Sequence, residues 1–133
     1  MSGSAPPAPP PLPLSEGERA LLRRGVAQFN ARLYFECHDT LEELWAELRD
    51  ERRGFVQGLI QLAVAFYHLG NGNQPGAVRL FDRGLERLRP YPADYAGLST
   101  GPLREAAGRW RDAAAAGDAL PDEPPPKVAL AGP

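Results

Sequence analysis

The feature that most constrains the fold is a long apolar segment, FVQGLIQLAVAFYHL, at residues 55–69. Apolar side chains occupy almost every turn of it, which predicts a helix that is buried on most of its sides. The segment is too short to cross a bilayer, which takes about 18 apolar residues, and it also carries glutamine and histidine. We therefore expect a helical domain that makes no contact with a membrane.

Four other segments place their apolar residues at helical spacing. The first follows a capping box, in which Ser15 precedes Glu18 by three positions. Pro75 suits the first turn of the fourth helix, because the N–H that it lacks needs no partner there. No segment alternates apolar and polar residues convincingly, as a strand would. These patterns predict an all-α fold, an antiparallel helical bundle of about five helices with short connections.

Both ends of the chain are rich in proline. The opening stretch, MSGSAPPAPPPLPL, and the closing stretch, GDALPDEPPPKVALAGP, are low in complexity, which predicts disordered Pro-rich tails. A length of 133 residues fits one domain. We therefore expect three parts: a disordered Pro-rich arm at 1–14, a helical bundle domain at 15–116 and a disordered tail at 117–133.

Composition and charge argue against several classes of partner. The formal net charge is −2 and the isoelectric point is about 5.7, so nothing draws the whole chain to nucleic acid or to an anionic membrane. The single cysteine, Cys37, rules out a disulfide within the chain. The first residues lack the basic and apolar regions of a secretory signal, so the expected location is the cytoplasm. We expect neither nucleic acid nor a membrane as a partner.

The stretch YFECHDTLEELW, residues 34–45, concentrates four carboxylates and a histidine in one predicted helix. On a helical wheel His38 and Glu42 lie one turn apart, beside an apolar stripe that includes Leu41. A tight turn joins this helix to the next, so the two should pack antiparallel, which brings Glu42 level with Gln61. The residues that we expect to converge along this seam as a ligand-binding cluster are Glu36, His38, Asp39, Glu42, Gln61 and His68.

The same residues resemble a known family. YFECHDTLEELW, followed by FVQGLIQLAVAFYHLGNGNQPGAVRLF, is similar to small prokaryotic and plastid proteins catalogued as domain of unknown function 309. Their recurring pattern is an E-x-H-E-x-x-E-x-x-W helix, then Q-G-L-I-Q, a histidine near the end of that helix and G-N-x-x-G-A. The likeness covers about residues 20–90, with Asp39 where the family more often has Glu, and it implies an all-helical fold without an established reaction. The family's polar positions correspond to Glu36, His38, Asp39, Glu42, Trp45, Gln57, Gln61, His68, Asn73 and Gly76.

One function compatible with this cluster is a site for a small ligand or a divalent metal. His38 and Glu42 would chelate one ion, and Glu36, Asp39 or His68 would complete the ligand shell. Nitrogen and oxygen ligands together suit zinc, manganese or iron, and a bound metal could activate water for hydrolysis. The Glu-x-x-His pairs of known di-metal bundles are missing from the sequence, so the reaction, if any, stays open.

Two other functions compete with the metal site. The cluster could be a structural polar network that only locks the packing of two helices, or the domain could be an interaction module that binds a partner or forms a homo-oligomer through an exposed helix face. In each case we expect Trp45 to anchor the core, with its indole N–H on an acceptor. We expect Cys37 to be a small buried side chain and not a nucleophile. The fourth helix carries four arginines that we expect in solvated ion pairs, Arg79, Arg83, Arg87 and Arg89.

Overall fold

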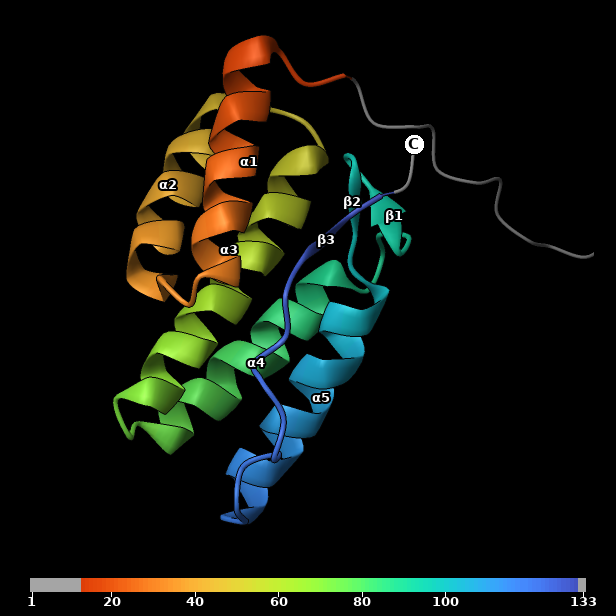
Figure 1. The fold of residues 1–133 in the computed structure, drawn as a ribbon. Coiled ribbons are helices and arrows are strands. Elements are labelled where there is room, and N and C mark those ends of the chain that lie inside the picture. Colours follow the sequence, from red (N-terminus) through yellow and green to blue (C-terminus); the bar gives the residue numbers. More distant parts are fainter. Residues whose placement is uncertain (1–12, 132–133) are drawn as a thin grey trace, which may run out of the picture.

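The structure is a computed structural model, and it describes residues 13–131. Within these residues it consists of five helices and a small antiparallel sheet (Figure 1). Each helix packs against the next along the chain, so the predicted all-α bundle is confirmed. In chain order the elements are α1 (Glu16–Asn30), α2 (Tyr34–Glu47), α3 (Arg52–Gly70), α4 (Gln74–Leu88), β1 (Asp94–Tyr95), β2 (Leu98–Ser99), α5 (Gly101–Ala116) and β3 (Ala129–Leu130).

Short-range hydrogen bonds fix where the helices begin. The Glu18 N–H donates to Ser15 Oγ at 3.1 Å, and the Ser15 N–H donates to Glu18 Oε1 at 2.9 Å, so the predicted capping box is confirmed. At the start of α4 the Gly76 N–H donates to Asn73 Oδ1 at 3.0 Å. Each side chain satisfies a backbone N–H that has no partner within its own helix.

The helix α3 is the central element of the core. It packs against both α2 and α4, and Phe55 and Leu62 on it are completely buried. Its Phe66 ring meets Phe81 of α4 edge-on at 5.0 Å and Trp110 of α5 at 5.7 Å. The prediction that this helix is buried on most sides is confirmed. No helix in the described part of the chain combines the length and the hydrophobicity of a membrane span.

Contacts at both ends of α2 show how it lies on α3. The Phe35 ring, at the start of α2, lies 5.6 Å from the Tyr67 ring near the end of α3. The Arg53 guanidinium, at the start of α3, lies 3.6 Å from the centre of the Trp45 ring near the end of α2. The two helices therefore run antiparallel, as the tight turn between them predicted.

A C-terminal strap, residues 118–131, differs from the disordered tail that we expected. It leaves the end of α5 and returns along that helix to the small sheet (Figure 1). There β3 pairs with β2, with Leu130 opposite Leu98, and Val128 is only 5% exposed. The side chain of Asn30 binds the backbone of Val128 twice, donating to its carbonyl oxygen at 3.0 Å and accepting from its N–H at 2.7 Å. Residues 1–12 of the predicted arm and residues 132–133 lie outside the described residues.

The Asn30 amide should therefore hold the strap in place. We expect Asn30→Ala to lower the free energy of unfolding by about 1–3 kcal/mol, because it leaves two buried backbone groups without partners. The matched control is Asn71→Ala, which changes an exposed asparagine for which no side-chain hydrogen bond occurs among residues 13–131. Urea unfolding of both variants measures the difference. Equal stabilities would show that the strap does not depend on this clamp.

Candidate functional site

The apolar stripe of α2 fixes which of its polar residues can form a site. Cys37, Leu41 and Leu44 are buried, each at most 2% exposed. His38 and Glu42 follow the stripe by one position, so they lie at its edge on the side of α3. This is the flank that also carries Trp45, which touches Arg53 of α3.

His38 lies between two carboxylates of its own helix. Its Nε2 is 3.1 Å from a Glu42 oxygen, one turn along α2, and its Nδ1 is 3.3 Å from an Asp39 oxygen. The His38 side chain is 27% exposed, whereas those of Asp39 and Glu42 are 63% and 54% exposed. The Nδ1 atom is buried and makes no hydrogen bond, because its approach to Asp39 is close but not aligned. The cluster is thus half-buried at the imidazole and open to solvent at the carboxylates.

These three residues have the composition and spacing of a cation site. One potential ligand atom from each of His38, Asp39 and Glu42 lies within 4.8 Å of the others. No arginine or lysine among residues 13–131 pairs with either carboxylate. The negative charge of the cluster is therefore offset only by the imidazole when it is protonated.

The other predicted site residues lie outside this cluster. Gln61 turns toward α4, where it lines an open groove, and its Oε1 is buried without a hydrogen-bond partner. His68 lies at the end of α3, where its Nδ1 is 3.4 Å from the Asn73 side-chain nitrogen. Glu36 is exposed and pairs with no cation among the described residues. Of the six predicted residues, the structure brings together His38, Asp39 and Glu42, and it places Glu36, Gln61 and His68 apart from them.

Two expectations about neighbouring residues have different outcomes. Cys37 is completely buried, and burial raises the pKa of its thiol to about 12, so it is not a nucleophile, as predicted. Trp45 is only partly buried, and its indole N–H has no acceptor among residues 13–131. The Arg53 guanidinium stacks on the indole ring instead, so the prediction of an indole hydrogen bond was wrong.

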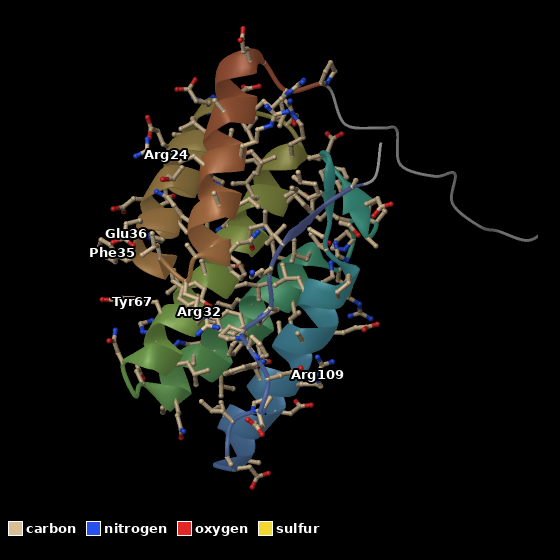
Figure 2. All side chains as sticks on the ribbon, in the orientation of Figure 1. Arg24, Arg32, Phe35, Glu36, Tyr67 and Arg109 are labelled. Atoms are coloured by element: carbon tan, nitrogen blue, oxygen red, sulfur yellow. The ribbon has the colours of Figure 1, made fainter. Side chains whose placement is uncertain are left out.

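The sequence analysis did not predict an exposed aromatic pair that lies next to the cluster. Phe35 is 51% exposed and Tyr67 is 39% exposed, and the Phe35 ring is 6.0 Å from the His38 ring. Figure 2 shows Phe35 and Tyr67 together at one edge of the molecule, with Glu36 beside them. The signal was available, because Phe35 falls outside the apolar stripe of α2, where burial cannot explain it.

Comparisons with known proteins agree with the family pattern of α2 and α3. Residues 22–80 match the family profile described as "Domain of unknown function (DUF309)". The chain carries a DUF309 domain. This match spans α2 and α3 completely, together with the cluster of His38, Asp39 and Glu42. The resemblance inferred from the sequence motifs is confirmed.

Two curated relatives of this chain are themselves uncharacterised. One is "Uncharacterized protein YpuF" of Bacillus subtilis, 44% identical over 66 residues, which cover 48% of this chain and 38% of the relative. Another is an "Uncharacterized protein" of Aquifex aeolicus, 25% identical over 88 residues, which cover 65% of this chain and 26% of the relative. The chain therefore spans well under half the length of either relative. Their names supply no activity, so function must be argued from the geometry of the site.

Proposed function

We propose that this DUF309 domain binds one divalent metal ion on the outer flank of α2, through His38, Asp39 and Glu42. The observation that carries the proposal is that one potential ligand atom from each of the three residues lies within 4.8 Å of the other two. Ligands about 2.1 Å from a zinc ion in tetrahedral geometry lie about 3.4 Å from each other. The distance of 3.1 Å between His38 Nε2 and the Glu42 oxygen is close to that spacing, and Asp39 lies within the wider limit of 4.8 Å.

The ligand set favours a borderline metal such as zinc, manganese or iron over calcium or magnesium. One imidazole and two carboxylates combine nitrogen with oxygen ligands, whereas calcium and magnesium prefer oxygen ligands alone. His38 would bind through Nε2, because its Nδ1 is buried. Three protein ligands leave coordination positions for water or for a small ligand, as in sites where a metal activates a bound molecule.

The competing interpretation, a network that locks helix packing, has less support. Such a network should cross from α2 to α3, because only contacts between helices can fix their packing. Both close contacts of His38 stay within α2. No hydrogen bond or ion pair in the described part of the chain joins the cluster to Gln61 or His68.

A metal titration tests the proposal. We expect the protein to bind Zn²⁺ or Mn²⁺ at one ion per chain, measured by calorimetry and by metal analysis after dialysis. His38→Ala and Glu42→Gln should each weaken binding at least about 10-fold, because each removes a direct ligand. Glu43→Gln is the matched control, since this exposed carboxylate is adjacent in sequence and outside the cluster, and it should leave affinity unchanged.

Stability measurements separate this site from a structural network. His38→Ala at a partly exposed position should change the free energy of unfolding of the metal-free protein by no more than about 0.5 kcal/mol. Absence of stoichiometric binding by the wild type would contradict the metal site. A large loss of stability in His38→Ala and Glu42→Gln, without any metal binding, would favour the structural network instead.

A further inference from the structure

One face of the bundle is formed by α2, α3 and α4, and its two edges differ in charge. Its middle is a half-buried strip of α3, with α2 on one side and α4 on the other. Arg53 on this strip touches α2, and Gln61 turns toward α4, so the strip lies between them. We call this surface the α2–α3–α4 face. The residues of its middle strip are Arg53, Gln57, Gln61, Val64 and His68.

The α2 edge of this face is apolar and acidic. Phe35 and Tyr67 form an exposed aromatic pair, 51% and 39% exposed, of the kind that marks a docking surface. Asp39 and Glu42 lie on the same flank, where they pair with no arginine or lysine among the described residues. A partner on this edge should therefore offer an apolar recess and positive charge.

The α4 edge offers both of these features. An open groove of about 1000 Å³ follows α4, lined in part by Leu85 and Pro90. Arg83 and Arg87 also line it, one turn apart, and neither forms an ion pair among residues 13–131. The acidic side chains on the same helix have other partners, because Asp82 pairs with Arg111 and Glu86 with Arg89. Of the four arginines expected in ion pairs, only Arg89, at the end of α4, forms one among residues 13–131.

Contacts between the helices show the height of each charge along α3. On the α2 side, Phe35 is level with Tyr67 and Trp45 with Arg53, so Glu42 is near the level of Gly58 and Asp39 near that of Leu62. On the α4 side, a Cβ on Gly58 would meet Leu88 and Arg87, and one on Gly84 would meet Leu62. Arg87 is therefore near the level of Gly58, and Arg83 near that of Leu62.

We propose that a second copy of this chain docks on the α2–α3–α4 face, related by a two-fold axis that lies in the contact plane and runs parallel to α3. The rotation exchanges the two edges and keeps the heights along α3. It places Glu42 opposite the partner's Arg87, both near the level of Gly58, and Asp39 opposite the partner's Arg83, both near that of Leu62.

A second copy fits better than an unrelated partner, because each edge supplies what the other lacks. A two-fold contact needs a self-complementary surface, in which residue i meets residue j and residue j meets residue i. One axis satisfies both charge pairs, and the symmetry forms each pair twice. This dimer goes beyond the proposed metal site and does not rest on it.

Sedimentation equilibrium of two charge-reversed variants tests the dimer. We expect the wild-type chain of 14.4 kDa to sediment as a dimer. The double variant Arg83→Glu, Arg87→Glu and the double variant Asp39→Arg, Glu42→Arg should each dissociate about 100-fold more readily, because like charges then face each other. An equimolar mixture of these two variants should dimerise again, because both charge pairs are restored in the heterodimer.

The matched controls reverse the same number of charges at positions outside the α2–α3–α4 face. Glu47→Arg with Glu105→Arg changes two exposed carboxylates off the face: Glu47 lies on the opposite side of α2 from Trp45, since a step of two residues is about 200° on a helix, and Glu105 belongs to α5. Arg23→Glu with Arg24→Glu changes two exposed arginines of α1. Both control variants should remain dimeric, and circular dichroism should show that all four variants are folded.

The dimer would be overturned if the wild-type chain stays monomeric at about 100 µM, which is about 100 times a micromolar dissociation constant. A dimer that survives both charge reversals would also overturn it, because another surface would then be in contact. The metal site fails separately. His38→Ala removes a metal ligand and no dimer contact, whereas Arg83→Glu with Arg87→Glu removes dimer contacts and no metal ligand.

Discussion

Phe81→Ala is expected to lower the free energy of unfolding by about 3–5 kcal/mol, the cost of removing a large buried aromatic side chain. The Phe81 side chain is completely buried, and its ring meets Phe66 edge-on at 5.0 Å. Alanine would leave a cavity where α4 packs on α3, and a small domain has only about 5–15 kcal/mol of stability in total. Urea unfolding followed by circular dichroism measures the loss.

The control for this prediction is the same substitution at the surface. Phe35→Ala removes a phenylalanine that is 51% exposed, and at low protein concentration it should cost less than about 1 kcal/mol. Dilution matters, because Phe35 belongs to the proposed dimer contact. Similar losses for the two variants would mean that Phe81 is not part of a close-packed core.

The helices were predictable because their signals are local. The capping box of Ser15 and Glu18 lies within four residues, and the apolar run at residues 55–69 indicates burial wherever its neighbours lie. These signals need no knowledge of the rest of the fold. The order of packing followed from short connections, which make successive helices neighbours.

The C-terminal strap was not predictable from local signals. Its two-residue strands are too short to show a period of two, and its proline content is typical of disordered segments. The strap is held by Asn30, which is 98 residues away from Val128 in the sequence. Contacts at that distance leave no trace in composition or periodicity.

The candidate site was predictable within one helix and not between two. The spacing of His38 and Glu42 placed them together, because residues one turn apart on a helix share a face. Gln61 was expected at the same seam from its height alone. The position of a residue along α3 does not determine the direction in which its side chain points around the helix axis. In the structure Gln61 turns to the groove beside α4.

The two proposals share two carboxylates, Asp39 and Glu42. A metal ion and the partner's arginines would both be attracted to Asp39 and Glu42, because these side chains have no cationic partner among residues 13–131. Sites that compete for the same groups are thermodynamically linked, so binding of one weakens the other by the same factor. A metal that binds here would therefore shift the chain toward the monomer.

Gly84→Val is expected to cost about 3 kcal/mol, the second large effect that the structure predicts. A Cβ on Gly84 would lie 2.8 Å from Leu62 Cδ2 and 3.1 Å from the Gly58 carbonyl oxygen. The Leu62 side chain is completely buried and the Gly58 oxygen belongs to the backbone, so neither can move aside easily. Valine would push α4 away from α3, which also displaces Arg83 and Arg87 from the proposed dimer contact.

The control is Gly108→Val, since Gly108 is also within a helix and a Cβ there would meet no atom within 4 Å. This variant should be neutral or more stable by a few tenths of a kcal/mol, because valine favours a helix slightly more than glycine does. Thermal unfolding should therefore show a lower melting temperature for Gly84→Val and an unchanged or slightly higher one for Gly108→Val. A stable Gly84→Val variant would show that α3 and α4 can separate without loss, and the dimer geometry derived from their close contact would lose its basis.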